Sequence, residues 1–372
     1  MKRKAFWASL LLALSQFGFA ADSAQQQVNA LLAHLDSKDA PGAAVLVVKD
    51  GVVMFERGYG VTDLRTRQAI DPHTNFRLAS VTKQFTAMAV MLLVHDGKLH
   101  YEDRVTDIFP DFPSYGRAIT IRHLLNHTSG LADYEELMTA PDPNTPSENV
   151  LQIHDAAVLE LLKQQKTTNF APGTKWAYSN SGYVVLGVIV AKVSGIPFGD
   201  FMRQHIFAPL GMNSTIAYEK GKNEVAHRAY GYSRDGKGWK ETDQSPTSAT
   251  LGDGGVYSSL DDLAKWDAAL RRHTLLSEAE MKPALTPANP PGGSAEEPDG
   301  SPAQYGFGWF LNPYRGHARM WHPGETMGFR TAVQRFIDEK LTVIVLCNRI
   351  DLEARDIALR IADVYLPGKP GQ

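Results

Sequence analysis

A serine and a lysine lie three residues apart at the start of a long apolar run. They are Ser80 and Lys83 in FRLASVTKQF, and the run VTKQFTAMAVMLLV (81–94) is apolar almost all round, which predicts a buried helix. Residues at i and i+3 of a helix project from the same face, so we expect the two side chains to be in contact. Burial disfavours an ammonium group and lowers its pKa, so an amine in this position is suited to activate the serine hydroxyl as a nucleophile.

Two further motifs lie far along the chain, and they are needed because Ser-x-x-Lys alone arises about once by chance in a chain of this length. Tyr178 and Asn180 stand in a loop before a second apolar helix that is expected to end at Gly195, although Asn180 could serve only as a helix cap. His322 and Gly324 flank a proline, after a short predicted strand and before a turn, although this could be an ordinary Pro-Gly turn.

Strand-like runs near both ends of the chain predict one antiparallel sheet. A hairpin is indicated within 42–60, where two β-rich runs flank Lys49-Asp50-Gly51. The later strand-like runs, of which the last three are joined by short turns, are 254–259, 305–311, 319–322, 329–337 and 341–348. Helical spacing occurs at 28–38 and at the closing segment 352–366, and the chain is mostly helical from about 80 to 215. These elements predict a mixed α/β (α+β) fold, in which helices flank an antiparallel sheet and a mostly helical lobe lies beside it, with the active site between them.

The first 20 residues are typical of a secretory signal peptide. A basic start at 2–4 precedes an apolar stretch, and Gly-Phe-Ala at 18–20 offers small residues for cleavage. The stretch is shorter than the ~20 apolar residues of a spanning helix and is interrupted by Gln16, which argues against a membrane anchor. We therefore expect 1–20 to be removed, leaving 21–372 as a single catalytic domain that is exported, periplasmic or secreted by a bacterium, and free of the membrane.

Composition narrows the classes of partner. The formal net charge is −3 and no basic cluster remains beyond the signal, so nucleic acid is not an expected partner, and the oligomeric state stays open. Cys347 is the only cysteine, so no intrachain disulfide can form, and its strand-like surroundings predict a buried, inert thiol. Two stretches, 139–149 and 286–304, are predicted loops. The second is long enough to be a lid over the site or merely mobile, and we favour mobility.

Ser-x-x-Lys, Tyr-x-Asn and His-x-Gly, in this order, resemble the three active-site motifs of serine β-lactamases and penicillin-binding proteins. The surrounding segments are similar to the class C β-lactamase-related branch of that superfamily, which also holds esterases, D-amino-acid peptidases and DD-peptidases. These segments include RLASVTKQFTA, ITIRHLLNHTSGL, FAPGTKWAYSNSGYVVLG, GDGGVYSSLDDLAKW and WHPGETMGF. The resemblance extends from about residue 40 to 350. It implies a β-lactamase/transpeptidase-like fold, a small-molecule or peptide acyl substrate, and neither a cofactor nor a metal.

The resemblance assigns the chemistry to three side chains. Ser80 is implied to be the acylated nucleophile, and Lys83 its partner in proton transfer. Tyr178 is implied to be the general base that takes the serine proton and later serves the deacylating water. A tyrosine has an unperturbed pKa near 10, so it needs nearby positive charge to act as a base at neutral pH. Lys83 and His322 are the expected sources of that charge.

Other residues are implied to bind the substrate. Asn180 would hydrogen-bond both the substrate and the lysine amine, and His322 would present a polar or cationic group from the edge strand. Gly324 is implied to be a third substrate-binding residue. The oxyanion hole would consist of the backbone N–H groups of Ser80 and Glu325. Removing one such donor typically lowers the rate by ~10²- to 10³-fold.

One departure from the family pattern limits the substrate. Related enzymes that act on β-lactams or D-Ala-D-Ala often have a threonine in the third motif, whose hydroxyl helps to bind the substrate carboxylate. Pro323 has neither a hydroxyl nor an N–H group. His322 replaces a permanently charged lysine and can be neutral at pH 7. These changes favour an ester, or an amide that is recognised by residues other than the third motif, over a β-lactam or a D-alanyl-D-alanine carboxypeptidase substrate. Arg330 is an alternative source of positive charge for a substrate carboxylate.

Other kinds of site are less well supported. His123 and His127 have the i, i+4 spacing of a helical metal pair, but the glutamate of H-E-x-x-H and a clear third ligand are missing. The chain has no Gly-x-Ser-x-Gly element of an α/β-hydrolase and no Gly-x-x-x-x-Gly-Lys phosphate loop. A penicillin sensor that traps acyl groups without turnover is an alternative of another class. Retention of Ser80, Lys83 and Tyr178 together argues against it.

Overall fold

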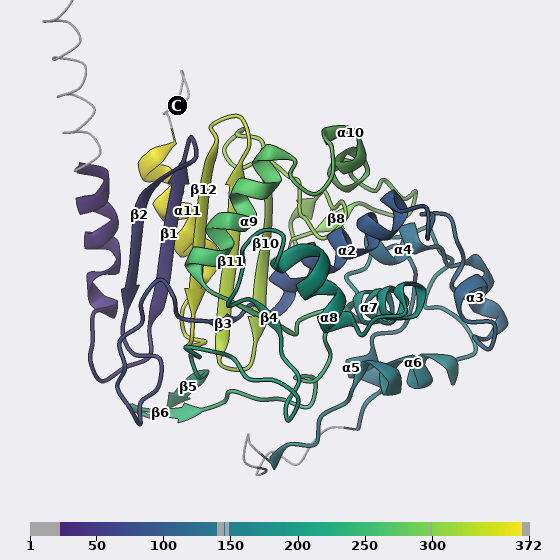
Figure 1. The fold of residues 1–372 in the computed structure, drawn as a ribbon, viewed down its shortest axis with the longest axis horizontal. Helices are drawn as coiled ribbons and strands as arrows, with labels where there is room; N and C mark the ends of the chain where they lie inside the picture. Colours follow the sequence, from purple (N-terminus) through teal and green to yellow (C-terminus); the bar gives the residue numbers. More distant parts are fainter. Residues whose placement is uncertain (1–22, 140–144, 146–148, 298–299, 367–372) are drawn as a thin grey trace, which may run out of the picture.

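Five antiparallel strands from both ends of the described chain form the main sheet, in the order β10-β11-β12-β1-β2 (Figure 1). The computed structural model describes residues 23–139, 145, 149–297 and 300–366. The strands of this sheet are β1 (Ala43–Lys49), β2 (Val52–Tyr59), β10 (Arg319–Thr326), β11 (Phe329–Phe336) and β12 (Leu341–Cys347). Because β1 pairs with β12, the sheet joins the two ends of the chain, as the sequence predicts.

Side chains of the main sheet point alternately to its two faces, and each face is covered by an apolar layer. Alternate residues of β12 from Leu341 to Cys347 pack against the C-terminal helix α11 (Ala354–Tyr365) and the helix formed by residues 23–32. Ile344 and Leu346 point the other way, into the layer that continues into the helical lobe. Successive side chains of a strand point to opposite faces, so a strand covered on both faces is apolar throughout, as LTVIVLC is. Cys347 is fully buried, and burial raises the pKa of its thiol to about 12, as expected for an inert cysteine.

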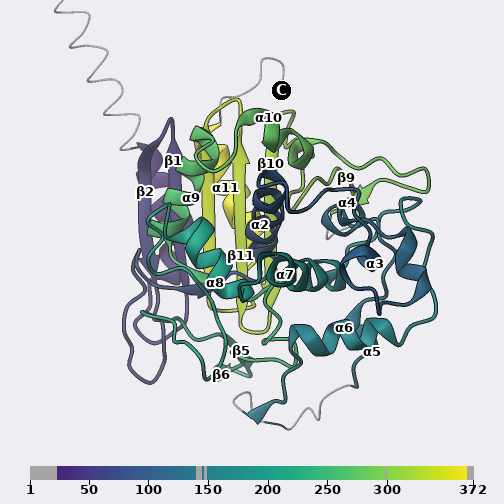
Figure 2. The same cartoon turned by 45° about the vertical axis from the view of Figure 1, so that its right-hand side comes forward.

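A mostly helical lobe lies beside the sheet, within the predicted span 80–215 (Figure 2). Its helices are α2 (Lys83–His95), α3 (Val105–Ile108), α4 (Ile121–Leu125), α5 (Tyr134–Leu137), α6 (Asp155–Lys163), α7 (Asn180–Ser194) and α8 (Phe198–Met202), followed by a π-helical turn, η5 (Arg203–Phe207). Besides the helix of residues 23–32, the described chain also contains α9 (Leu260–Arg272), α10 (Glu278–Met281) and α11 outside the short 3₁₀ turns. The 3₁₀ turns are η1 (Ala33–Leu35), η2 (Ala79–Thr82), η3 (Ser114–Ala118) and η6 (Lys282–Leu285).

The remaining strands are short. β3 (Phe76–Arg77), β7 (Val256–Ser258) and β4 (Ile216–Ala217) make a small antiparallel sheet. The other short strands form two separate pairs, β5 (Tyr232–Asp235) with β6 (Gly238–Glu241), and β8 (Ala295–Glu296) with β9 (Pro302–Ala303). The small sheet matters for the site, because β3 leads the chain directly into η2.

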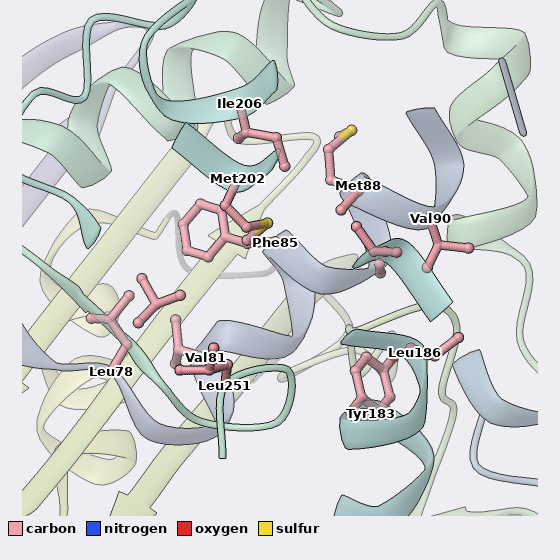
Figure 3. Packing of buried hydrophobic residues seen from close by; sticks show 14 of the residues in the cluster. Leu78, Val81, Phe85, Met88, Val90, Tyr183, Leu186, Met202, Ile206 and Leu251 are labelled. Carbon is pink, nitrogen blue, oxygen red and sulfur yellow. The ribbon is translucent and has the colours of Figure 1, made fainter. Parts of the chain in front are cut away.

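Helices α2 and α7 pack together in the interior of the lobe, as Figure 3 shows. Phe85 and Met88 on α2, and Tyr183 and Leu186 on α7, belong to one buried apolar cluster. The two helices are apolar nearly all round, and each is covered on most of its surface. Lys83, the first residue of α2, therefore begins a helix that has no polar face to turn toward water.

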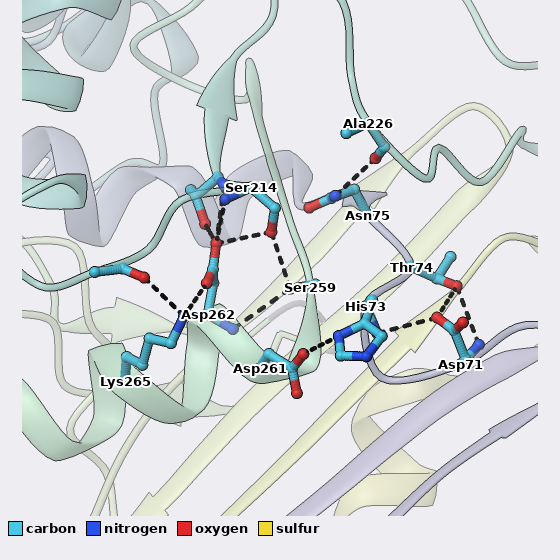
Figure 4. Close-up of polar contacts among 12 residues, drawn as sticks. Asp71, His73, Thr74, Asn75, Ser214, Ala226, Ser259, Asp261, Asp262 and Lys265 are labelled. Carbon is cyan, nitrogen blue, oxygen red and sulfur yellow. Dashed lines mark hydrogen bonds and ion pairs between the residues drawn. The ribbon is translucent and has the colours of Figure 1, made fainter.

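A buried carboxylate ties the small sheet to α9 (Figure 4). Asp262 accepts hydrogen bonds from the backbone N–H and hydroxyl groups of Ser214 and Thr215, which precede β4, and from Lys265. Burial opposes ionisation of Asp262, but the bonds from Lys265, Ser214 and Thr215 outweigh burial and lower its pKa. This contact holds β4 in place, and through β7 it supports β3, which precedes the catalytic turn.

Two strand predictions are wrong in detail. Residues 305–311 form no strand: Tyr305 and Phe310 make isolated bridges only, because the segment folds back on itself before β10. His322, Pro323 and Gly324 do not precede a turn, because they lie inside β10, which continues to Thr326. Proline is tolerated there because β10 is an edge strand.

The predicted signal peptide 1–20 and most of the loop 139–149 lie outside the described residues. Within the described part of the chain, no single helix is long and apolar enough to cross a membrane. The helix α7 and the segment Phe198–Phe207 reach that length only together, with a bend of 78° between them.

Candidate active site

Ser80 stands where β3 passes into η2, at the edge of a cavity of about 590 Å³. The residue before it, Ala79, takes a φ of 49° and is 2% exposed. A left-handed alanine is strained by roughly 1–2 kcal/mol, so the surrounding structure must hold this turn in place. The residues that line the cavity are Ser80, Trp176, Ala177, Tyr178, Asn180, Glu296, Glu297, Phe310, His322, Pro323 and Glu325.

The amine of Lys83 is fully buried and has three hydrogen-bond acceptors. Its Nζ donates to Ser80 Oγ at 3.0 Å, to Asn180 Oδ1 at 2.8 Å and to the carbonyl oxygen of Asp253 at 3.0 Å. The contact with Ser80 is the one that helical spacing predicts. Burial lowers the pKa of Lys83 to about 8, although the charges of Asp253, Asp133 and Glu135 oppose the shift. Three acceptors suit an ammonium group, and loss of one proton frees a lone pair that faces the serine hydroxyl.

Asn180 connects the lysine to a group of carboxylates. It is the first residue of α7, and the preceding Ser179 caps the helix through the Gly182 N–H. The Asn180 side chain offers Oδ1 to Lys83 and donates Nδ2–H to Glu135 Oε1 at 3.2 Å. The backbone N–H of Asn180 donates to Asp133 Oδ2 at 3.3 Å. These contacts fix the orientation of the amide, with its oxygen toward the amine.

The Tyr178 hydroxyl is buried next to the catalytic pair. Lys83 Nζ lies 4.8 Å from the centre of the Tyr178 ring. The Ser80 hydroxyl lies near enough to favour the phenolate, yet no group among the residues that the structure describes stands at hydrogen-bonding geometry to Tyr178 Oη. Burial dominates and holds the pKa of Tyr178 well above 10. Tyr178 is therefore a phenol at neutral pH in this state of the protein.

His322 was expected to present a polar or cationic group to the site and to supply positive charge beside Tyr178. It does not provide that positive charge. Its Nδ1 lies 2.6 Å from the Pro323 carbonyl oxygen, and because a carbonyl can only accept, Nδ1 is the donor. The other ring nitrogen, Nε2, then has no hydrogen and accepts a hydrogen bond from the Tyr305 hydroxyl at 3.0 Å. Burial, followed by the charge of Lys83, lowers the pKa of His322 to about 3. The ring is neutral and both nitrogens already have partners, so Lys83 is the cation that remains beside Tyr178.

The edge strand β10 faces the serine with part of its backbone. Trp321 exchanges both backbone hydrogen bonds with Phe310, on the side away from β11. Hydrogen-bonding direction alternates along an antiparallel strand, so Pro323 and Glu325 also face away from β11. The missing N–H of Pro323 removes no bond between the strands, and the N–H of Glu325 is directed toward the cavity that both residues line.

Gly324 allows η2 to approach this strand. A Cβ at this position would lie 2.1 Å from the Leu78 carbonyl oxygen and 2.2 Å from Thr331 Oγ1. Thr331 on β11 donates to the same Leu78 oxygen at 2.8 Å, which draws the turn before Ser80 against the sheet. The structure thus places Gly324 under the site, where it sets the distance between Ser80 and Glu325.

Several residues of the site were not found by sequence reasoning. Asp253 supplies the third acceptor for Lys83, and Glu135 contacts Asn180. Glu296 and Glu297, from the segment predicted to be a loop, line the cavity, and Tyr305 contacts His322. Asp253 lies in the segment GDGGVYSSLDDLAKW that supports the family resemblance, but loop carboxylates are usually surface groups and carry no signal of their own.

His127 packs behind the site and is not paired with His123 on one helix. It follows the end of α4 in a left-handed conformation, with a φ of 61°, and its Nδ1 accepts the Ser179 N–H at 3.1 Å. Its ring lies 4.4 Å from that of Tyr178, measured between centroids. Burial, with the charge of Lys83, lowers the pKa of His127 well below 6.5, so the ring is a neutral support for Tyr178.

Comparison with known proteins places this arrangement in a family. The beta-lactamase family model matches residues 26–366. Penicillin-binding protein 4* of Bacillus subtilis is 33% identical over 362 residues, which cover 93% of this chain and 77% of that protein. A D-aminopeptidase of Brucella canis is 29% identical over 89% of this chain, which spans only 61% of the relative. A solved penicillin-binding protein from Bacillus halodurans superposes with a TM-score of 0.76 at 27% identity, over 91% of this chain and 99% of that one. The chain belongs to the beta-lactamase family of serine hydrolases.

Proposed function

We propose that this protein is an exported serine hydrolase that cleaves a small ester or amide through an acyl-enzyme on Ser80, with esterase or D-amino-acid peptidase activity favoured. The observation that carries the proposal is the contact of the Ser80 hydroxyl with a fully buried lysine amine at the edge of a cavity. The similarity to a D-aminopeptidase supports hydrolysis of an amide. The signal-like segment 1–20 supports export.

The geometry favours Lys83 over Tyr178 as the group that takes the serine proton. Of the two groups, Lys83 has a pKa of about 8 and Tyr178 a pKa well above 10, so near neutral pH the amine is deprotonated far more often than the phenol. The Ser80 O–H bond breaks, its proton passes to Lys83 Nζ, and Oγ forms a bond to the substrate carbonyl carbon. The N–H groups of Ser80 and Glu325 receive the oxyanion. This assignment changes the role that the family resemblance implies for Tyr178.

The remaining steps need a proton donor on the leaving-group side. The phenol of Tyr178 is suited to protonate the departing alcohol or amine, and Lys83 then returns a proton to it. A water molecule next attacks the acyl carbon and gives up a proton to the neutral amine of Lys83. The bond between the acyl carbon and Ser80 Oγ then breaks, Lys83 passes that proton to Oγ, and the acid is released. Each cycle therefore consumes one water and restores Ser80, Lys83 and Tyr178 to their starting protonation states.

Recognition of a substrate carboxylate is not supported by the described lining of the cavity. Those residues include no lysine or arginine but three glutamates, Glu296, Glu297 and Glu325. Arg330, the alternative source of charge, donates to the carbonyls of Thr326 and Phe329 and lies 3.7 Å from a Glu325 carboxylate oxygen. An ester or amide without a nearby carboxylate is therefore preferred to a β-lactam.

The function is tested by incubating the mature protein with p-nitrophenyl acetate and with nitrocefin. We expect steady turnover of the ester, an acetyl adduct on Ser80 by mass spectrometry, and a higher kcat/KM for the ester than for nitrocefin. A burst of one equivalent without turnover would identify an acyl-trapping sensor. Absence of any adduct on Ser80 during turnover would overturn the proposal.

The pH dependence of the reaction should report Lys83. Because the neutral amine is the reactive form and its pKa is about 8, kcat/KM on a neutral ester is expected to rise about tenfold per pH unit below pH 8 and then level off. His322, with a pKa of about 3, adds no inflection near pH 6.5. Rates are measured against the Ser80→Ala variant to subtract hydrolysis by hydroxide. A flat profile from pH 6 upward would assign the base to another group.

A further inference from the structure

A second cavity, of about 410 Å³, lies between the C-terminal end of α9, the start of β10 and the turn that joins β11 to β12. Figure 1 shows α9 lying across a face of the main sheet. Among the described residues, this cavity shares no lining residue with the one that contains Ser80. Its volume lies within the range of about 300–1,000 Å³ that is usual for small-molecule sites. It can therefore hold a ligand of its own, independently of the chemistry at Ser80.

Apolar side chains form part of the lining, and two of them are exposed to solvent. Leu285 is 42% exposed and Ile337 is 47% exposed, and both line this cavity. Met281, Leu311 and Phe336 line it as well. Large apolar side chains that are exposed and gathered at one place indicate a surface that binds an apolar group. The cavity is thus suited to a ligand with a hydrocarbon part.

Positive charge in the lining exceeds negative charge. Asp267 on α9 is the only carboxylate among the described lining residues. It accepts hydrogen bonds from Arg335 Nε at 2.8 Å, from the Thr342 hydroxyl at 2.7 Å and from Arg271. Arg335 is 7% exposed, and its Nη1 donates to the sulfur of Met320 at 3.0 Å, which is a weak acceptor. One carboxylate therefore serves two guanidinium groups, and a second anion would relieve the unfavourable burial of the excess charge.

Lys340 adds a further positive charge. It is exposed in the turn between β11 and β12, lines the cavity, and forms no ion pair within the described part of the chain. Arg319 also lines the cavity, but its Nη2 pairs with Glu297, outside the lining, at 3.2 Å. Three cations of the lining then face one carboxylate, an excess of two positive charges, and His273 adds to the excess when it is protonated. A concave site with such an excess attracts anions.

We propose that this cavity binds the ionised form of a carboxylic acid with an apolar chain, such as a medium-chain fatty acid. The carboxylate pairs with the guanidinium of Arg271 and the ammonium of Lys340 through charge-assisted hydrogen bonds. The hydrocarbon chain covers Leu285 and Ile337 and removes their apolar surface from water. Neither part alone matches the lining, because an inorganic anion leaves the apolar side chains exposed and a neutral hydrocarbon leaves the charge uncompensated.

Isothermal titration calorimetry of the full-length protein with decanoate, propionate and decyltrimethylammonium tests the site. We expect one decanoate to bind per chain, roughly 100-fold more tightly than propionate, because only the longer chain covers the apolar side chains. The cation of the same chain length should bind at least about tenfold more weakly than decanoate, because the lining repels it. Failure of decanoate to bind, or equal affinity for decanoate and either of the other two ligands, would overturn the proposal.

Two neighbouring arginines of α9 provide a matched pair of variants. Arg271→Gln should weaken decanoate binding about tenfold, as loss of a charge-assisted hydrogen bond does. Arg272→Gln, next to it on α9 but outside the cavity lining, should leave the affinity unchanged. Lys340→Gln provides a second variant with the same expected loss, at an exposed position, should Arg271→Gln fail to fold. Unchanged affinity in folded Arg271→Gln or Lys340→Gln protein would place the decanoate elsewhere and overturn the proposal.

Light scattering on the same samples tests a different occupant of the apolar surface. We expect decanoate to bind without changing the state of association of the protein. A dimer that excludes decanoate and that dissociates in the Ile337→Asp variant would assign this surface to a second copy of the chain and would also overturn the proposal.

Discussion

Exchanging Lys83 for methionine is expected to lower kcat/KM on an ester by about 10³-fold. A positioned acid or base contributes typically 10²- to 10⁴-fold, and Lys83 is the group hydrogen-bonded to the nucleophile at 3.0 Å. The same assay on Ser80→Ala and on the double variant supplies a sharper test. Because the two side chains act as one unit, the double variant should be no slower than the slower single variant.

The Lys83→Met protein should remain folded, which separates loss of chemistry from loss of structure. The lysine is 0% exposed, and a pKa lowered from 10.5 to about 8 corresponds to about 3 kcal/mol of unfavourable burial at neutral pH. Methionine removes that penalty but leaves Asn180 Oδ1 and the Asp253 carbonyl without their donor, which is unfavourable by a similar amount. We expect a Tm close to that of the unmodified protein. Retention of more than a tenth of the activity would make Tyr178 the base.

Exchanging Gly324 for alanine is expected to damage both stability and rate, although the residue carries no functional group. Its new Cβ would lie about 2 Å from the Leu78 carbonyl oxygen and Thr331 Oγ1, so η2 and β10 must move apart. Overpacking of this kind destabilises by about 3 kcal/mol. It also separates the N–H groups of Ser80 and Glu325, and a shift of about 1 Å in such a site lowers the rate by about 10²-fold.

The matched control for Gly324→Ala is Gly238→Ala. Gly238 also lies in a strand, β6, but a Cβ there would be 3.5 Å from the Asp235 carbonyl oxygen, which is an ordinary contact. Its effect on stability should stay within about 0.5 kcal/mol, with kcat unchanged. Thermal unfolding and ester kinetics on both variants give the comparison. If Gly324→Ala resembled Gly238→Ala, the close approach of η2 to β10 would not be what positions the site.

Local sequence patterns correctly predicted the parts of the fold whose structure depends mainly on residues close together in sequence. The hairpin β1–β2 is closed by Asp50 and Gly51, both at positive φ, as the Lys-Asp-Gly turn indicates. The contact of Ser80 with Lys83 follows from helical spacing. By contrast, YGFGWFL has the composition of a strand but pairs only through isolated bridges, because no neighbouring strand is available along most of it.

The protonation states of the side chains in the site depend on residues that are far apart in sequence and that no local sequence pattern links. His322 is neutral because burial removes it from water and because the charge of Lys83, far away in sequence, lowers its pKa further. Lys83 meets Asn180, 97 residues away in sequence, and Asp253, 170 residues away. Only the resemblance to a known family indicated the first of these contacts, and nothing in the sequence indicated the second.

The sequence by itself determined which groups could react: a nucleophile and an amine in helical register, an apolar helix to bury them, and a third motif without a hydroxyl. The tertiary structure alone decided their protonation states and the character of the cavities, because the pKa of a buried group depends on every charge and hydrogen bond around it. The segments that bring Glu135, Asp253 and Tyr305 to the site are distant in sequence and are placed by packing of the whole lobe against the sheet.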